Sequence, residues 1–404
     1  MKFDKIIQKY ESQPEIPNVI EESIISLFGV SKLQDLQNKT DLAKRITNLF
    51  YGETKTNYTR SHKEYTLYYL PVNFYKVWQP LMDLLKYNLI KEKFNILELG
   101  VGPGSCTFGM IEFFKVLAID NLKTRFEINF CLIEKEKEFI DIFDNIFENY
   151  KLTFPENLNI NINWIHADLN NDIIMNDTKY DLIIESNMLN HNEKISQKVV
   201  DNLIELYSNN LNKHSSIIFI EPADEKIVNY LKKIKQKLKQ LSFNSYSPCC
   251  CDATVCKQFA SAKNYIGKSK IIKELRSMEE FRSLKFYHYF EYVVLRNDGL
   301  KKYKSFDNKV LLNNINNYIG QDISFKAFIL SSSNQQSKIV LKICDGSLCE
   351  RKDIWFEIPK TMLITQGFNP IDINRGEFIE VKRAKIVAQN KIICNLHSQI
   401  KVMR

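Results

Sequence analysis

One short segment constrains the possible fold of this chain more than any other. In it, three glycines at every second position follow directly after an apolar stretch. Residues 96–99 are apolar apart from Glu98, and the glycines after them are Gly100, Gly102 and Gly104. This order predicts a buried parallel strand, a tight turn and then a helix. Glycine suits such a turn because the backbone takes unusual angles there and a ligand has to approach the main chain closely. The segment therefore predicts a ligand-binding turn in an α/β fold.

Four more apolar segments follow, with helical stretches between them: residues 129–133, 161–165, 180–185 and 216–221. The first of these ends at Glu134, and an acidic side chain at the end of a second strand can accept hydrogen bonds from both hydroxyls of a ribose. Alternating strands and helices favour a parallel sheet that helices cover on both faces. The sequence therefore predicts a doubly wound, Rossmann-like α/β sheet.

At this point the chain resembles the class I S-adenosylmethionine-dependent methyltransferases. The first motif of that family is an acidic residue, one spacer and G-x-G-x-G, which matches residues 98–104 of this chain. A dinucleotide dehydrogenase more often has G-x-G-x-x-G, and this chain has Ser105 where the third spacing would need glycine. The alternative is a Rossmann-like sheet whose glycines only turn the chain.

The resemblance implies an S-adenosylmethionine site at the carboxyl ends of the strands. By resemblance the three glycines line the methionine part of the cofactor and Glu134 holds the ribose, while Asp168 and Leu169 flank the adenine. The whole set of cofactor-binding residues that we expect is Glu98, Gly100, Gly102, Gly104, Glu134, Asp168, Leu169 and Asn187.

The loop after the fourth predicted strand lacks a known catalytic signature. Amino-group methyltransferases of nucleic-acid bases often have Asn-Pro-Pro-Tyr there, whereas this chain has Asn187 and His191 without a proline pair. Each of these two side chains can orient a substrate or be purely structural. We therefore assign no catalytic residue, and a methyltransferase fold that serves as a binding module stands beside an active enzyme as an alternative.

Length and pattern predict three regions. Residues 1–90 are expected to be mainly helical, residues 91–305 to form the methyltransferase-like domain, and residues 318–404 to form a β domain. The last region has five strand-like segments with a short helix after the third, which predicts an OB-fold-like barrel. Such barrels commonly bind single-stranded nucleic acid; the alternative is a barrel that only packs against the core domain. The residues expected to contact nucleic acid are Phe325, Phe328, Trp355, Lys382, Arg383 and Lys385.

Positive charge is concentrated late in the methyltransferase-like domain, in a basic insertion at about residues 226–285. Residues 226–304 contain 18 Lys and Arg against 6 Asp and Glu, a net charge of +12, whereas the whole chain carries +8. The densest part is residues 232–239. A charge run is usually a solvated helix face, but so concentrated an excess suits a phosphate backbone. The charge therefore predicts a nucleic-acid partner, and RNA in particular.

The chain shows no sign of a membrane or secreted protein. No apolar run is long enough to cross a bilayer, and the first residues lack the apolar core of a secretion signal. We therefore expect no membrane partner and a cytoplasmic location, or the mitochondrial matrix for a eukaryotic host. The nine cysteines are accordingly expected to be thiols or metal ligands rather than disulfides.

Four of these cysteines lie within eight positions: Cys249, Cys250, Cys251 and Cys256. Thiolates this close together repel or oxidise unless a metal holds them. The cluster is too crowded for all four to bind one ion, so we expect a further ligand from Cys344, with Cys349 in reserve. Cysteine-only ligation suits zinc or an iron–sulfur cluster.

A methyltransferase core followed by such cysteines resembles a narrower family, the methyltransferase-like proteins associated with the mitochondrial small ribosomal subunit, and their bacterial relatives. The resemblance covers roughly residues 60–350 and follows motif order. It implies a [4Fe–4S] cluster, and it implies small-subunit ribosomal RNA or the assembling small ribosomal subunit as the partner. The expected metal ligands are Cys249, Cys251, Cys256 and Cys344.

The chain departs from that family at the cysteines. Cys250 and Cys251 replace the Pro-His pair that follows the first cysteine of the family, and the expected Trp-Cys-His-Phe element is absent after Cys256. Zinc and a metal-free cysteine patch therefore stay as alternatives to the cluster.

Two functions follow from these patterns. The first is a ribosome-associated, methyltransferase-like protein that binds S-adenosylmethionine and small-subunit ribosomal RNA and acts in small-subunit assembly or translation. The second is an active S-adenosylmethionine-dependent RNA methyltransferase. A third alternative is a methyltransferase that acts on a small molecule or a protein.

Overall fold

The structure is a computed structural model of the chain. It describes residues 2–12, 15–31, 34–35, 61–169, 178–188, 197–222, 225–248, 262–265, 268–278, 281, 287–302, 308–347, 353–367 and 377–403. The chain forms two compact units. One comprises Met1–Ala223 with Lys263–Phe290, and the other comprises Asp224–Ala262 with Glu291–Arg404.

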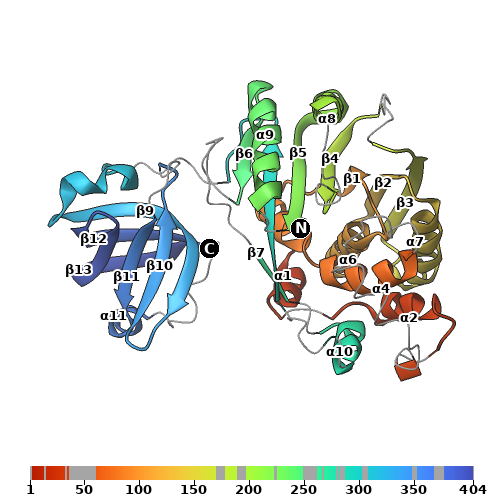
Figure 1. Cartoon of the computed structure of the whole chain (residues 1–404), viewed down its shortest axis with the longest axis horizontal. Coiled ribbons are helices and arrows are strands. Elements are labelled where there is room, and N and C mark those ends of the chain that lie inside the picture. The colour runs from red at the N-terminus through yellow and green to blue at the C-terminus, as the bar shows by residue number, and fades with distance from the viewer. Residues whose placement is uncertain are drawn as a thin grey trace. The chain divides into compact units, whose positions relative to one another are not determined.

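The main sheet has the strand order β3-β2-β1-β4-β5-β8-β6, and β7 pairs with β8 (Figure 1). The strands are β1 (Lys93–Leu99), β2 (Phe126–Glu134), β3 (Leu158–His166), β4 (Tyr180–Ser186), β5 (Leu211–Pro222), β6 (Asn244–Ser247), β7 (Ala262–Tyr265) and β8 (Tyr287–Arg296). The first five are parallel to one another, and β6 is antiparallel to β8. The predicted doubly wound, Rossmann-like sheet is confirmed.

The register of the parallel strands brings their carboxyl ends to one edge of the sheet. Leu99, the last residue of β1, lies opposite Ile133 on one side and Glu185 on the other. Ser186 in turn lies opposite Ile220 of β5. The residues that follow these strands therefore meet at the same edge, where ligands bind in open α/β sheets.

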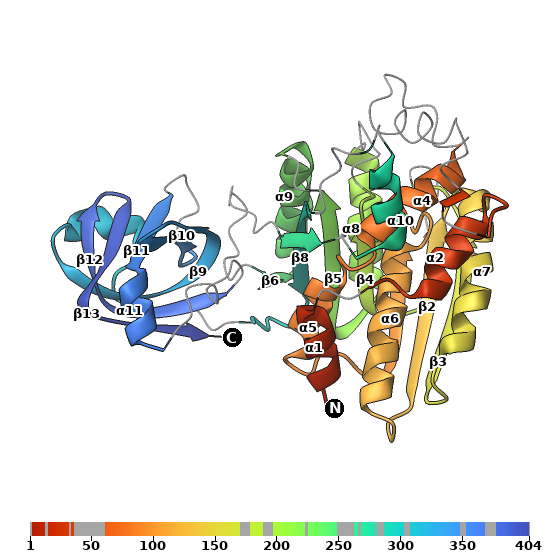
Figure 2. The same ribbon diagram turned by 90° about the horizontal axis from the view of Figure 1, so that it is seen from below.

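Helices pack on this sheet and on one another. Figure 2 shows α6 (Ser105–Asp120) and α7 (Lys137–Tyr150) beside β2 and β3. The helices that the structure describes in the N-terminal region pack against these two helices. They are α1 (Asp4–Glu11), α2 (Asn18–Ser26), α4 (His62–Asn73) and α5 (Trp78–Leu85).

Three further helices follow the central strands. They are α8 (Gln197–Asn210), α9 (Glu225–Gln240) and α10 (Lys270–Ser277), with the short 3-10 turn η3 (Lys151–Thr153) after α7. The dense basic run at residues 232–239 lies within α9, whose apolar side chains Leu231, Ile234 and Leu238 are buried. Within the described residues, the helices are all too short or too polar to span a bilayer.

The second unit contains a closed barrel of five strands in the order β10-β11-β13-β12-β9. Its elements are η6 (Leu312–Tyr318), β9 (Asp322–Asn334), β10 (Lys338–Cys344), β11 (Ile354–Pro359), α11 (Lys360–Thr365), β12 (Phe378–Ala388) and β13 (Lys391–Met403). The pair β11 and β13 is parallel and the other pairs are antiparallel. The barrel and the helix after its third strand confirm the predicted C-terminal β domain.

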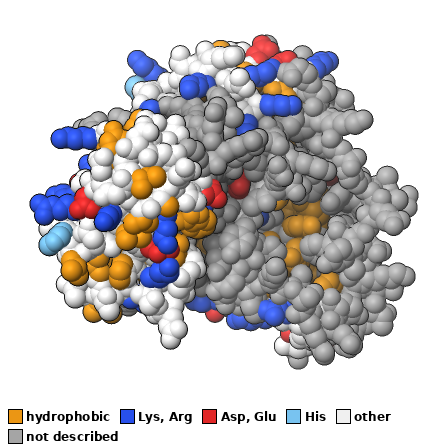
Figure 3. All heavy atoms as spheres, turned by 60° about the vertical axis from the view of Figure 1, so that its left-hand side comes forward, with side chains coloured by type: hydrophobic (Ala, Val, Ile, Leu, Met, Phe, Trp, Pro, Cys, Tyr) orange, Lys and Arg blue, Asp and Glu red, His pale blue; other side chains and the backbone are white. Residues whose placement is uncertain are grey.

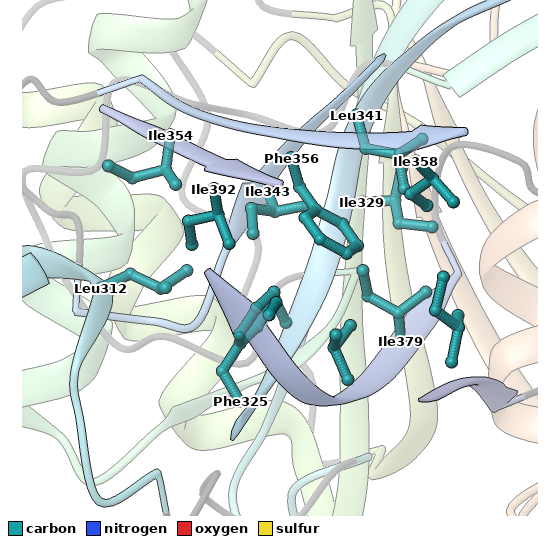
Figure 4. Packing of buried hydrophobic residues seen from close by; sticks show 14 of the residues in the cluster. Leu312, Phe325, Ile329, Leu341, Ile343, Ile354, Phe356, Ile358, Ile379 and Ile392 are labelled. Carbon is teal, nitrogen blue, oxygen red and sulfur yellow. The ribbon is translucent and has the colours of Figure 1, made fainter. Parts of the chain in front are cut away.

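The barrel interior is filled by alternating apolar side chains (Figure 4). Phe325 of β9 packs edge-to-face on Phe356 of β11, with 5.4 Å between the ring centroids. Phe325 and Phe328 are 2% and 1% exposed. The expectation that these two rings are available for base stacking is therefore wrong, because both point into the core rather than toward solvent.

Candidate functional site

The glycine turn joins β1 to α6 at the carboxyl edge of the sheet. Gly100, Gly102 and Gly104 have φ values of 66°, 55° and 88°, in the left-handed region. A Cβ atom on Gly104 would lie 2.3 Å from Cδ2 of Phe143, so this position also needs glycine for packing. A Cβ atom on Gly102 would meet nothing within 4 Å. The middle of the turn is therefore open toward a ligand.

Glu134 ends β2 and holds this turn. Its Oε2 accepts a hydrogen bond of 2.7 Å from the amide of Gly102. Its Oε1 accepts hydrogen bonds of 2.9 Å from the amides of Lys135 and Glu136. A carboxylate accepts about four hydrogen bonds, so Oε2 has room for one more donor, such as a ribose hydroxyl. The predicted partners Gly102 and Glu134 thus lie in direct contact.

Asp168 and Leu169 follow β3 at the same edge. The β2–β3 register places Glu134 opposite His166, and the amide of Ala167 donates to the backbone carbonyl of Glu134 at 3.2 Å. Asp168 and Leu169 are both half-buried. The structure therefore brings this predicted segment to the end of the strand that carries Glu134.

Glu98 lies inside the core, where Thr107 of α6 donates a hydrogen bond of 2.5 Å to its Oε2. The pKa of Glu98 is raised to about 8, chiefly because the group is removed from water; the hydrogen bond from Thr107 acts against this shift, and the charge of Glu134 adds to it. This contact joins β1 to α6 directly beneath the residues that begin the glycine turn.

Asn187 follows β4 with a φ of 56°. Its amide donates a hydrogen bond of 2.8 Å to the carbonyl of Ile220, which fixes the loop to β5. Its Oδ1 lies 3.5 Å from Nζ of Lys76, a residue from the segment between α4 and α5. The structure therefore places this predicted residue next to a buried cation.

Sequence reasoning missed Lys76 and two buried acids near it. Lys76 is 5% exposed. Burial lowers its pKa to about 8, while the charge of Glu221 acts in the opposite direction. Glu185 is fully buried, and neither of its carboxylate oxygens has a hydrogen-bond partner among the described residues. Burial, followed by the charge of Glu221, raises the pKa of Glu185 well above its usual value.

A sequence signal for these acids does exist. Glu185 and Glu221 each follow an apolar run and precede the last residue of their strand, and such an acid lies at the ligand-binding edge of a parallel sheet. No comparable signal marks Lys76, because its neighbours at the site are more than a hundred residues away along the chain.

The cysteine prediction falls mostly outside the described residues. Cys249, Cys251 and Cys256 lie there, and so do Cys250 and the reserve ligand Cys349. Cys344 ends β10 and is 3% exposed, and its Sγ accepts a hydrogen bond of 3.3 Å from the amide of Gly346. The metal centre and the choice of its ligands stay a prediction.

No family model and no curated protein matches the chain. Solved structures that resemble it include a methyltransferase from Pyrococcus furiosus, with 15% identity over 55% of this chain and 83% of that chain and a TM-score of 0.33. The N-methyltransferase NodS from Bradyrhizobium japonicum, in complex with S-adenosylhomocysteine, has 13% identity over 55% and 85% with a TM-score of 0.31. The plantazolicin methyltransferase BpumL, also with S-adenosylhomocysteine, has 13% identity over 66% and 100% with a TM-score of 0.30. Likenesses this weak assign neither a substrate nor a reaction to this chain.

Proposed function

We propose that the turn between β1 and α6 binds S-adenosylmethionine and that the chain is a methyltransferase or a binding protein derived from one. The observation that carries this proposal is the contact between Gly102 and Glu134. It combines an open left-handed turn with a buried carboxylate that still has one acceptor site. These two features suit the close approach of a nucleoside and the binding of its ribose.

When bound, S-adenosylmethionine supplies an activated methyl group for transfer to a nucleophile. Gly100, Gly102 and Glu134 would hold the cofactor, and Asp168 and Leu169 would flank it. Lys76, with a pKa lowered to about 8, loses its proton close to the pH at which a general base works. Its Nζ is therefore our candidate for accepting a proton from a substrate near Asn187.

The test is calorimetry with S-adenosylmethionine on the full chain. Gly102→Arg should abolish the binding heat, because the new side chain enters the open space of the turn. Gly29→Arg is a matched control, since Gly29 has a φ of 67° and likewise no atom within 4 Å of a built Cβ. The proposal fails if the wild type does not bind, or if both variants bind as the wild type does.

We further propose that the partner is RNA, and specifically small-subunit ribosomal RNA or the assembling small subunit. Support comes from the net charge of +12 over residues 226–304 and from α9, where Lys233 and Lys239 are exposed and Lys232, Lys235 and Lys237 are half-buried. Lys382, Arg383 and Lys385 of the barrel are also exposed. Figure 3 shows many Lys and Arg side chains on the described surface, with fewer acidic ones.

RNA binding is tested by the salt dependence of affinity, because phosphate contacts release counterions. Replacing Lys232, Lys233, Lys235 and Lys237 with Glu should weaken binding and flatten the slope of affinity against salt. An unchanged slope would mean that the lysine run at residues 232–239 is only a solvated helix face. Cross-linking in cells, with a methylation map of a deletion strain, separates a binding protein from an active RNA methyltransferase. A lack of RNA cross-links would favour a small-molecule or protein substrate.

A further inference from the structure

A histidine and two glutamates lie together near the carboxyl edge of the main sheet, where the first residue of α4 approaches the start of α7. They are His62, Glu136 and Glu138, and their nearest ligand atoms all lie within 4.8 Å of one another. Glu136 is the residue before α7 and Glu138 lies in its first turn. His62 is brought to them from 74 residues away by the packing of α4 on α7.

One ring nitrogen of the histidine has no hydrogen-bond partner among the described residues. This nitrogen is Nε2, and His62 is 9% exposed. The nearest carboxylate oxygen, Oε2 of Glu136, lies 3.9 Å away, which is too long for a hydrogen bond. Phe139 packs edge-to-face on the ring with 4.6 Å between centroids and so fixes its orientation. Most buried polar atoms have a hydrogen-bond partner, so an unpaired nitrogen in this position calls for an explanation, and a bound ion is one.

We propose that His62, Glu136 and Glu138 bind one divalent transition-metal ion. An imidazole nitrogen with two carboxylates is a ligand set found at zinc, manganese and iron(II) sites. Bonds of about 2.1 Å require ligand atoms that lie no more than about 4.2 Å apart. The two glutamates are half-buried and exposed, so their side chains can close the remaining gap while the histidine stays in place. Water completes the coordination.

Some of the surrounding charges favour the binding of a cation and others disfavour it. The amino end of α7 carries a partial positive charge, which disfavours a cation. The ammonium of Lys135 also lies 3.6 Å from Oε1 of Glu136, but this lysine is 53% exposed and can turn toward solvent. The two carboxylates carry two full negative charges, which outweigh the partial charge of the helix. We therefore expect the site to bind a divalent ion in preference to the ammonium group of Lys135.

This site is distinct from the predicted cysteine centre and from the glycine turn. It nevertheless adjoins the turn, because the amide of Glu136 donates to Oε1 of Glu134. An ion on Glu136 would therefore hold the start of α7 in the position that supports the Glu134 carboxylate. Metal binding by itself requires neither S-adenosylmethionine nor a methyl-transfer step.

The test is titration of the full chain with Mn²⁺, followed by the loss of the sharp electron paramagnetic resonance signal of the free ion. Mn²⁺ suits carboxylate ligands, whereas thiolates select softer metals, so the cysteines should contribute little. We expect one bound ion per chain. Glu138→Gln and His62→Asn should weaken binding by roughly tenfold or more, since even residues that only support a ligand change metal affinity by about 10- to 100-fold.

Two controls make the result specific. Asp141→Asn removes a carboxylate that is 63% exposed and lies on the same helix outside the group, and it should leave Mn²⁺ binding unchanged. Cys256→Ser should leave it unchanged as well. Circular dichroism establishes that each variant is folded, and the exposed Glu138 provides a variant that should not disturb the core. The proposal is overturned if the wild type leaves the Mn²⁺ signal unchanged, or if folded Glu138→Gln binds as tightly as Asp141→Asn.

Discussion

The barrel interior and the carboxyl edge of the main sheet are both buried, but the side chains buried in the two places differ in kind. The barrel core consists mainly of aliphatic and aromatic side chains such as Phe356, Ile343 and Leu341, together with the uncharged thiol side chains of Cys344 and Cys394. The sheet edge buries ionisable groups in addition to apolar ones: Lys76, Glu98, Glu134, Glu185 and Glu221.

The difference separates what stabilises this protein from what its function needs. Apolar burial gains free energy from the hydrophobic effect and from close packing. Burial of an ionisable group costs free energy unless hydrogen bonds or opposite charges compensate. Groups with strongly shifted pKa values are accordingly concentrated at functional sites. The barrel interior is thus a packing core, and the sheet edge is where we expect chemistry or ligand binding.

The largest effect should come from the barrel core. Phe356→Ala is expected to lower the free energy of unfolding of the barrel by about 3–5 kcal/mol, because it removes a fully buried ring and leaves a cavity. Urea unfolding measures this, followed by the fluorescence of the three tryptophans, of which Trp355 is adjacent to the substitution. Leu396→Ala, at a side chain that is 98% exposed in the same barrel, should change stability by less than about 0.5 kcal/mol. Equal losses in the two variants would contradict the assignment of Phe356 to a packed core.

A smaller effect is expected from Glu98, and it should depend on pH. The folded-state pKa of about 8 lies above the unfolded value of 4.5, so the folded chain holds this proton more tightly. The resulting stability is complete below pH 4.5 and is lost as pH rises through 8. Between pH 4.5 and pH 7 the loss should reach about 3 kcal/mol, at up to about 1.4 kcal/mol per pH unit.

Glu98→Gln tests this directly, because the amide can still accept a hydrogen bond from Thr107 but cannot titrate. The difference in unfolding free energy between wild type and variant should therefore change across this pH range. Phe356→Ala should lower stability without changing the pH slope. A pH-independent difference for Glu98→Gln would mean that this carboxyl is not buried as described.

The smallest effect should come from Lys76 and should have the opposite sign. Its folded pKa of about 8 lies below the ordinary 10.5, so the unfolded chain holds the proton more tightly. Wild-type stability should rise by about 2.5 kcal/mol, relative to Lys76→Met, as pH increases from 8 to 10.5. Differential scanning fluorimetry over this range measures the change. A difference that stays flat would place the ammonium in contact with solvent.

The local elements were predictable because their signals are local. The predicted strand at residues 180–185 lies within β4, and the glycine turn follows β1 as expected. The five barrel strands and the helix at α11 also appear in the predicted order. The alternation of apolar and polar residues, however, did not indicate which face of β9 lies inward. Phe325 and Phe328 were therefore assigned to a ligand surface, whereas the barrel closes over them.

The sequence by itself determined the order of strands and helices, the glycine turn and the acid at the end of β2, because turn geometry and hydrophobic periodicity act over a few residues. Only the tertiary structure decided which distant groups share one environment. Lys76 reaches Asn187, and His62 reaches Glu136, through helix packing that no short pattern encodes. Their pKa values and ligand preferences arise from burial and from neighbouring charge, and both of these exist only after the chain has folded.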